Sequence, residues 1–502
     1  MENNRKAPLE LTAKEFKSLG HNLIDSISGF NETISERPVT TGETPKQLQS
    51  LLGNQSFPEN GTSASVLLEK ATDLLYNHSL FNGHPKFMGY ITGSAAPIGA
   101  LGDLLAASVN PNVGAFALSP MATEIEKQTI QWLAQFIGVE SNYGGVLVSG
   151  GNMANFTAFL AARTAKAPAN IKEEGLGSLK KKLIMYCSKS THTWIDKAAI
   201  LFGHGTNAIR WIETDADNKM NLEALENAIT TDIIEGNEPF FVVGTAGDVS
   251  TGTVDNLEGI SAICKLYHMW FHVDGAYGAP ANIIPELEAT FKGIKEADSI
   301  AIDPHKWLYS PLEAGCTLVK NPKHLTDAYS SHPEYFNFDT EDAEQNYYEY
   351  GLQNSRGFRA LKVWLMLQQV GRQGYQEMIS EDIKLSKLLF ELADQHPNLD
   401  AVTQSLSIAT FRYIPSEIPQ HLENKQVYLN ELNEKLTTRL QKSGEVFISN
   451  AIINENYCLR SCIVNFRTSK KDIEEIIDIV EEEGNKVHQQ MLTDSVLQLQ
   501  NQ

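Results

Sequence analysis

SIAIDPHKW, residues 299–307, is an apolar run that passes directly into a polar turn carrying a lysine. A continuous apolar run of this length is typical of a strand that is buried on both faces. At the end of such a strand the amine of Lys306 loses hydration, which favours its neutral, nucleophilic form. The alternative interpretation is a lysine whose charged head reaches the solvent while its stem stays buried.

The same pattern of an apolar run followed by a polar turn recurs along the middle of the chain, from about residue 120. Helical stretches separate the runs, and continuous apolar strands that alternate with helices predict a parallel sheet with helices on both faces. We expect strands at 146–148, 183–187, 208–212, 240–244, 270–273 and 299–302, and helices at 152–166, 193–202, 221–229 and 257–267. The expected fold class is therefore α/β.

The two ends of the chain differ from this middle part. The first 92 residues contain two expected helices, at 10–28 and 65–77, and a connection rich in Pro, Gly, Thr and Asn, so they have little core of their own. After residue 380 we expect helices at 382–395, 427–442 and 471–491 and strands near 408–413 and 459–466. The expected organisation is an N-terminal helical arm that would lie against another surface, such as a second subunit (1–92), a large α/β domain (93–380) and a small α/β domain (381–502).

Composition argues against several classes of protein. The 502 residues carry a formal net charge of −21, whereas nucleic acids and anionic membranes require a basic surface. No apolar run approaches the ~18 residues of a membrane span. The five cysteines are too few, and odd in number, for a disulfide framework, which fits the reducing cytoplasm. Cys458 and Cys462 have no partner pair nearby, so we interpret them as buried small side chains and expect no metal site.

Polar or glycine-containing segments follow five of the expected strands. In an open α/β sheet, ligands bind beyond the carboxyl ends of the strands, so five such segments predict one deep site. The segments are Ser149–Asn152, Ser190–Thr193, Thr245–Asp248, Asp274–Tyr277 and Asp303–Lys306.

Three of these segments suggest particular chemistry. Gly150 and Gly151 ahead of a helix let the backbone approach a phosphate, although Ser-Gly-Gly is also an ordinary strand-to-helix turn. Asp274 at the end of a buried strand needs a cationic partner, such as a protonated pyridine nitrogen, or it is simply a turn residue. His192 could lie flat over a planar cofactor, or it is a capping or core histidine.

Taken together, the segments resemble the pyridoxal-phosphate-dependent group II decarboxylases, which include aromatic-L-amino-acid and glutamate decarboxylases. The resemblance covers the chain from about His84 onward. It rests on DPHKW (303–307), HVDGAY (272–277), HPKF (84–87) and SPMATEIE (119–126). It implies the type I fold of pyridoxal-phosphate enzymes, with a mostly parallel seven-stranded sheet flanked by helices.

The resemblance also implies roles for individual residues. Lys306 would hold pyridoxal 5'-phosphate as a Schiff base, Asp274 would pair with the pyridinium nitrogen, and His192 would stack on the ring. Gly151 and Asn152 would help to hold the phosphate. The bound cofactor would then withdraw electrons from an L-amino acid as it loses carbon dioxide.

Two further residues receive roles from the resemblance. His305 would lie near the phosphate. SHPEYF (331–336) resembles the family's mobile loop with its catalytic tyrosine, so Tyr335 would protonate the substrate carbon. That protonation favours release of an amine, whereas Phe at the position would favour an oxidative deamination that yields an aldehyde. A surface aromatic without a role is the alternative for Tyr335.

A protein that binds the cofactor without turnover belongs to a different functional class. That class predicts a replaced lysine or aspartate at the two central positions, and both Lys306 and Asp274 are present. We therefore favour an enzyme.

The chain departs from the family in two places. Asp248 and Val249 stand where the family usually has two threonines, so a hydroxyl contact to the cofactor would come from Thr245 or Ser250. Asp303 stands where many members have Asn. Both departures concern the anchoring of the cofactor and leave its electron-withdrawing role unchanged.

The substrate and the assembly are expectations of the same kind. We expect an aromatic L-amino acid, whereas the polar asparagines among the pocket candidates leave glutamate, diaminobutyrate or another polar amino acid open. Arg356 and Arg460 could bind a substrate carboxylate or form structural salt bridges. Because family members are dimers with active sites at the subunit interface, we expect a cytoplasmic homodimer. The pocket candidates are Tyr90, Thr92, Asn112 and Phe116, with Asn110 and Val113 beside them.

Overall fold

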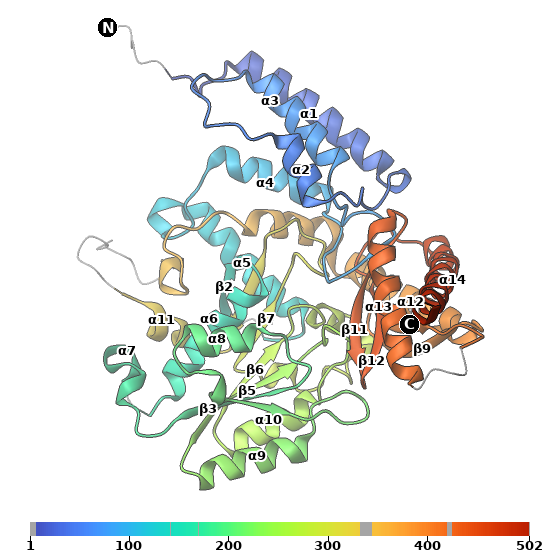
Figure 1. Ribbon diagram of the computed structural model, residues 1–502. Helices are drawn as coiled ribbons and strands as arrows, with labels where there is room; N and C mark the ends of the chain where they lie inside the picture. Colours follow the sequence, from blue (N-terminus) through green and yellow to red (C-terminus); the bar gives the residue numbers. More distant parts are fainter. Residues whose placement is uncertain (1–6, 141, 169, 332–343, 419–423, 501–502) are drawn as a thin grey trace, which may run out of the picture.

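A computed structural model of the chain describes residues 7–140, 142–168, 170–331, 344–418 and 424–500 (Figure 1). Within these ranges the chain forms two separate β-sheets, each with its own buried apolar cluster. None of the described helices is both long enough and apolar enough to cross a membrane.

The larger sheet has seven strands in the order β2-β8-β7-β6-β5-β3-β4. β8 runs antiparallel to both of its neighbours, and the other neighbouring pairs are parallel. The expected mostly parallel seven-stranded α/β fold is thus confirmed. The strands are β2 (Gly144–Val148), β3 (Leu183–Ser188), β4 (Ile209–Ile212), β5 (Glu238–Thr245), β6 (Trp270–Asp274), β7 (Ser299–Ile302) and β8 (Gly315–Val319).

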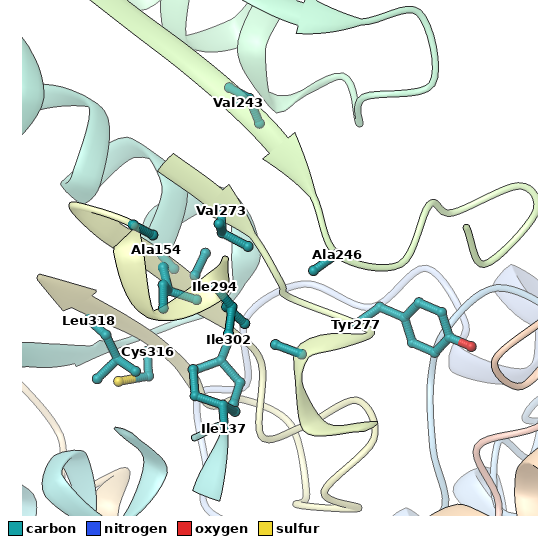
Figure 2. Close-up of a cluster of buried hydrophobic side chains, with 14 of the residues drawn as sticks. Ile137, Ala154, Val243, Ala246, Val273, Tyr277, Ile294, Ile302, Cys316 and Leu318 are labelled. Carbon is teal, nitrogen blue, oxygen red and sulfur yellow. The ribbon is translucent and has the colours of Figure 1, made fainter. Parts of the chain in front are cut away.

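Helices cover this sheet and close its core. α6 packs against β7 and β8, whereas α9 and α10 pack against β5. Figure 2 shows apolar side chains from several of these elements meeting in one cluster, among them Ala154, Val273 and Ile302. The helices of this part are α5 (Pro120–Phe136), α6 (Gly151–Lys166), α7 (Ile171–Glu174), α8 (Trp194–Leu201), α9 (Leu222–Ile234), α10 (Leu257–Leu266) and α11 (Lys323–Tyr329).

The smaller sheet has the order β1-β11-β12-β10-β9 and is formed mainly by the C-terminal part of the chain. Only the β1–β11 pair is parallel among its neighbouring strands. Its strands are β1 (Phe87–Met88), β9 (Leu399–Ser405), β10 (Ile408–Tyr413), β11 (Phe447–Ile453) and β12 (Asn456–Cys462), and its helices are α12 (Ala360–Gln395), α13 (Lys425–Ser443) and α14 (Lys470–Gln500).

The N-terminal helices lie apart from both sheets, at the top of Figure 1. None of α1 (Ala13–Thr33), α2 (Pro45–Leu52) and α3 (Ala64–Asn77) contains a buried residue, and α4 (Pro97–Val109) buries only two glycines. Thr12 and Glu15 form a capping box that fixes the start of α1. The two expected arm helices are thus present, and α2 is an additional helix inside the connection.

The three-part division at residues 92 and 380 stays a prediction. β1 lies before the first boundary but pairs with β11, and α12 runs across the second boundary with a non-helical Gly371 at φ +66°. Limited proteolysis would test whether the chain is cleaved at these places.

Candidate active site

A cavity of about 680 Å³ lies at the carboxyl ends of the central strands of the large sheet. All five polar segments contribute to its wall, from the ends of β2, β3, β5, β6 and β7. The lining residues from these segments are Ser149, Gly150, Gly151, Asn152, Ser190, His192, Thr245, Gly247, Asp274, Ala276, Tyr277, Asp303, His305 and Lys306.

The amine of Lys306 reaches this cavity from the turn after β7. Its Nζ lies 3.0 Å from Oδ2 of Asp303, and the Lys306 side chain is 24% exposed whereas that of Asp303 is 1% exposed. His305 Nε2 lies 3.7 Å from the same oxygen, and His305 Nδ1 accepts a hydrogen bond from the Ala314 N–H. Burial lowers the pKa of His305, so we treat its ring as neutral near pH 7.

Asp274 ends β6 and is held by two side-chain donors on Oδ2. Trp194 Nε1 donates over 2.8 Å and Asn155 Nδ2 over 3.3 Å. Among the described residues, Oδ1 accepts only a long hydrogen bond, of 3.3 Å, from the Ala276 N–H. The carboxylate is therefore fixed in orientation and keeps acceptor capacity for a cationic ligand atom in the cavity.

His192 lies in the loop between β3 and α8. Its Nδ1 accepts a hydrogen bond from the Trp194 N–H over 3.3 Å. Desolvation lowers the pKa of His192, and the charge of Asp274 partly opposes that effect. A neutral imidazole at this wall can cover a planar ring without adding positive charge to it.

The strand-to-helix turn after β2 forms a backbone cradle. Gly150 has φ +155°, which side-chain-bearing residues rarely adopt, and α6 begins at Gly151 with its N–H groups directed to this end. A Cβ on Gly151 would lie 2.7 Å from Asp303 Oδ2. A side chain at this position would collide with Asp303, so glycine keeps the N-terminus of α6 open to the cavity.

Thr245 and Ser250 could each supply the hydroxyl contact that Asp248 and Val249 cannot make, and they differ in where they lie. Thr245 lines the cavity, with its Oγ1 3.5 Å from Thr191 Oγ1. Ser250 does not line it, because its N–H donates to Asp248 Oδ1 in a tight turn that also uses both donors of Thr251. Burial raises the pKa of Asp248.

The expected substrate residues lie outside the wall of this cavity. Ile91 lines it, but its neighbours Tyr90 and Thr92 do not, and neither do Asn112 and Phe116. The Asn112 Oδ1 accepts hydrogen bonds from the backbone N–H groups of Gly114 and Arg356, so Asn112 holds a local turn. Tyr335 lies outside the described residues.

Arg356 and Arg460, the two candidates for binding a substrate carboxylate, differ in their contacts. Arg356 forms a bidentate ion pair with Glu126 and donates to two backbone carbonyls, so its side chain has a structural role and is not free to bind a substrate. Arg460 is 2% exposed and donates through Nη1 to Ser449 Oγ and the Tyr90 carbonyl. Its Nε and Nη2 have no hydrogen-bond partner among the described residues.

Two residues that hold Asp274 in place were not identified from the sequence. Asn155 and Trp194 hold Asp274 from 119 and 80 residues away. Asn155 lies three residues after Asn152 on the same helix, and this helical spacing is a signal that could have identified it. No described group of three or more His, Cys, Asp or Glu side chains could hold a metal ion.

These residues fit one kind of ligand. A partly exposed amine suits an aldehyde, a buried acceptor-only carboxylate suits a protonated ring nitrogen, and a glycine turn at a helix N-terminus suits a phosphate. Pyridoxal 5'-phosphate combines all three groups in one molecule.

Comparisons with known proteins agree with this fit. The model described as pyridoxal-dependent decarboxylase conserved domain matches residues 45–414, and a PDXDC1-like second central domain matches residues 377–491. An aromatic-L-amino-acid decarboxylase of Bacillus atrophaeus is 33% identical over 473 residues, which cover 93% of this chain and 95% of the relative. A phenylacetaldehyde synthase of a Rosa hybrid cultivar is 28% identical and covers 95% of both chains.

Solved structures are similar over nearly the whole chain. Catharanthus roseus tryptophan decarboxylase in complex with L-tryptophan has a TM-score of 0.85 at 26% identity, covering 96% of this chain and 100% of that one. Mouse CSAD in its apo form has a TM-score of 0.87 at 25% identity, covering 93% and 98%.

Proposed function

The chain belongs to the pyridoxal-dependent decarboxylase family, and we propose that it converts an aromatic L-amino acid into the corresponding amine and carbon dioxide. It is a pyridoxal-phosphate-dependent amino-acid decarboxylase. The observation that carries the proposal is the presence of the Lys306 amine and the Asp274 carboxylate in the wall of one cavity. The relative named aromatic-L-amino-acid decarboxylase, 33% identical over 93% of this chain, supports the aromatic substrate class.

The proposed roles follow from the contacts of each side chain. When bound, pyridoxal 5'-phosphate withdraws the electrons left by the departing carboxyl group. Lys306 Nζ is the atom that would bond to the cofactor, and Asp274 Oδ1 would keep its ring nitrogen protonated. His192 would cover one ring face, and the Gly150-Gly151 turn would bind the phosphate.

Further residues complete the proposed site. Asn152, His305 and Thr245 line the same cavity and would contact the cofactor. Asp303 would act on the Lys306 amine through their ion pair. Ser250, which donates its N–H to Asp248, would at most support the loop.

Proton delivery is assigned to Tyr335. Its hydroxyl would donate a proton to the substrate carbon after carbon dioxide has left, and the amine product would follow. A phenol in this role favours amine formation, whereas phenylacetaldehyde synthases among the relatives make aldehyde formation the competing outcome.

Measuring carbon dioxide, amine, peroxide and ammonia together distinguishes amine formation from aldehyde formation. Purified protein with the cofactor should release one carbon dioxide per amine from an aromatic L-amino acid, without peroxide or ammonia. The screen should include the twenty amino acids and diaminobutyrate, and Lys306→Ala should abolish turnover. Peroxide and ammonia in equal amounts would indicate aldehyde formation, and release from glutamate or diaminobutyrate alone would overturn the aromatic substrate class.

We also propose a homodimer with the active site at the subunit interface. Large apolar side chains are exposed along the N-terminal helices, including Leu67 and Leu75 on α3 and Leu104, Leu105 and Val109 on α4. Exposed apolar surface of this extent is typical of an interface. Light scattering should give twice the mass of one chain, and a fully active monomer at high dilution would contradict the proposal.

The proposed location is the cytoplasm. All five cysteines lie buried as free thiols, which suits a reducing compartment. Fractionation of the source cells with an antibody to the chain would test it.

A further inference from the structure

A line of buried polar side chains leads from Asp274 into the sheet, away from the cavity. Asn155 Oδ1 lies 2.7 Å from His272 Nε2, His272 Nδ1 lies 2.8 Å from Ser299 Oγ, and Trp270 Nε1 donates to Ser299 Oγ over 2.8 Å. His272 and Ser299 are fully buried and do not line the cavity. Buried polar groups are costly unless each is hydrogen-bonded, so the direction of every bond along the line matters.

The direction of these bonds follows from the carboxylate end. An ionised carboxylate can only accept, so the amide nitrogen of Asn155 must face Asp274 Oδ2. The amide oxygen of Asn155 then faces His272 Nε2. Because an amide oxygen can only accept, His272 must carry its proton on Nε2.

The other end of the line is consistent with that tautomer. Burial lowers the pKa of His272 to about 4, so the ring is neutral near pH 7 and carries only one proton. Nδ1 must therefore accept the hydroxyl proton of Ser299. The indole of Trp270 can only donate, and it occupies a lone pair of the same hydroxyl. Every donor in the line thus points toward Asp274.

The Asn155 amide could in principle face Asp274 with either its nitrogen or its oxygen. A carboxamide turned by 180° would direct its oxygen at the Asp274 carboxylate and repel it. The Asp274 carboxylate therefore fixes the Asn155 amide, and through it the position of the His272 proton on Nε2. Ser299 is compatible with this tautomer, because its hydroxyl can donate to Nδ1 while it accepts from Trp270.

We propose that His272 and Ser299 are positioning residues that act through Asn155 to hold the Asp274 carboxylate in the orientation that faces the cofactor ring nitrogen, and so keep that nitrogen protonated. The inference rests on the proposed function and deepens it. His272 and Ser299 would contact neither cofactor nor substrate, and their effect would reach the ring only through the Asn155 amide.

The test uses holoenzyme loaded with pyridoxal 5'-phosphate that is ¹⁵N-labelled in the ring. The nitrogen chemical shift reports directly whether the ring nitrogen is protonated. We expect a protonated nitrogen in the unsubstituted enzyme and a shift toward the neutral value in His272→Phe. The kcat should fall by ~10- to 100-fold while KM changes by less than ~3-fold, because substrate binding is not altered.

Three variants make the result specific. His272→Gln places an amide that can still donate to Asn155 and should recover most of the nitrogen shift. Ser299→Ala removes only a hydroxyl, so it should fold even where His272→Phe does not, and it should move the shift in the same direction. His204→Phe is the matched control, since His204 is half-buried, has its pKa lowered to about 4 by desolvation and stacks on Phe240 instead of joining the line.

The outcomes are distinguishable from failure of the proposed function. Borohydride reduction followed by peptide mass analysis shows whether the cofactor is attached at Lys306. If the unsubstituted enzyme shows no attachment, the proposed function fails. If His272→Phe and Ser299→Ala carry the cofactor at Lys306 with an unchanged nitrogen shift, this inference alone is overturned.

Discussion

The Nζ of Lys306 lies 3.0 Å from Oδ2 of Asp303, a side chain that is 1% exposed. Neither oxygen of Asp303 forms a hydrogen bond with another described residue, so the lysine is the main group that offsets its charge. This ion pair must be broken before the amine can attack an aldehyde. Asp303 thus holds the resting lysine in place and restrains its reaction.

Asp303→Asn should accelerate attachment of pyridoxal 5'-phosphate to the apoprotein. The variant removes the anion and keeps the shape, so the amine is no longer held in the ion pair and we expect a ~3- to 10-fold higher rate near pH 7. Stopped-flow absorbance of the cofactor band would give the rate. Asp327→Asn, which breaks an exposed lysine pair, is the control and should leave the rate unchanged. An equal or lower rate in Asp303→Asn would contradict this reasoning.

Gly151→Ala should weaken cofactor binding. Its added methyl group would lie 2.7 Å from Asp303 Oδ2 and 3.4 Å from the Ala276 side chain, so the turn must open where a phosphate would bind. We expect a loss of affinity of ~10- to 100-fold, read from an absorbance titration. Gly177→Ala is the matched control, because a methyl group there meets nothing within 4 Å. Equal affinities for the two variants would mean that the cradle does not hold the cofactor.

Local patterns explain which parts of the fold could be predicted from the sequence. The strand at Ser299–Ile302 has the predicted bounds, and α6, α8 and α10 differ by one residue at most at either end, because an apolar run and its turn residues lie together in the sequence. β8 was missed because it returns antiparallel after a turn without a helix. α5 was missed, although it begins within the SPMATEIE segment.

In the candidate site, too, the residues predicted from the sequence are those whose chemistry lies within a few neighbouring residues. The Lys306, Asp274 and Gly151 segments carry their chemistry within a few residues, and they line one cavity. The partners of Asp274 are remote in sequence, and so is the partner of Arg356, which the sequence left open between a substrate carboxylate and a salt bridge. The carboxylate that pairs with Arg356 is Glu126, 230 residues away, and no local pattern identifies it.

Arg356→Ala should destabilise the protein strongly. Both members of the Arg356–Glu126 pair are at most 2% exposed, so the variant leaves a buried carboxylate without its cation. Such a loss costs ~3–5 kcal/mol. Urea unfolding of the apoprotein would measure it. Lys323→Ala removes an exposed ion pair and should change the unfolding free energy by less than ~0.5 kcal/mol. Similar values for the two variants would argue against a structural role of Arg356.

Because of Asp382, we expect the free energy of unfolding to fall as the pH rises toward neutrality. The Oδ2 of this side chain accepts hydrogen bonds from Trp307 Nε1 over 2.9 Å and from the Tyr309 hydroxyl over 2.6 Å, and both donors follow Lys306 closely in sequence. Burial raises the pKa of Asp382 to about 7. The folded protein therefore holds this proton more tightly than the unfolded chain, whose aspartates titrate near ~4. The resulting stabilisation is complete below pH ~4 and is lost as the pH rises toward ~7, by ~4 kcal/mol at most.

Asp382→Asn should remove this dependence. The amide keeps an acceptor oxygen for Trp307 and Tyr309 but does not titrate, so the free energy of unfolding of the variant should lose less between pH 4 and 7. Subtracting the two unfolding curves isolates Asp382, because other buried groups, such as Asp255 with its pKa raised to about 6, are the same in both proteins. The difference should grow in favour of the variant as the pH rises. A constant difference over this range would show that the Asp382 carboxyl does not titrate within it, and the turn after Lys306 would then be held by an ionised carboxylate.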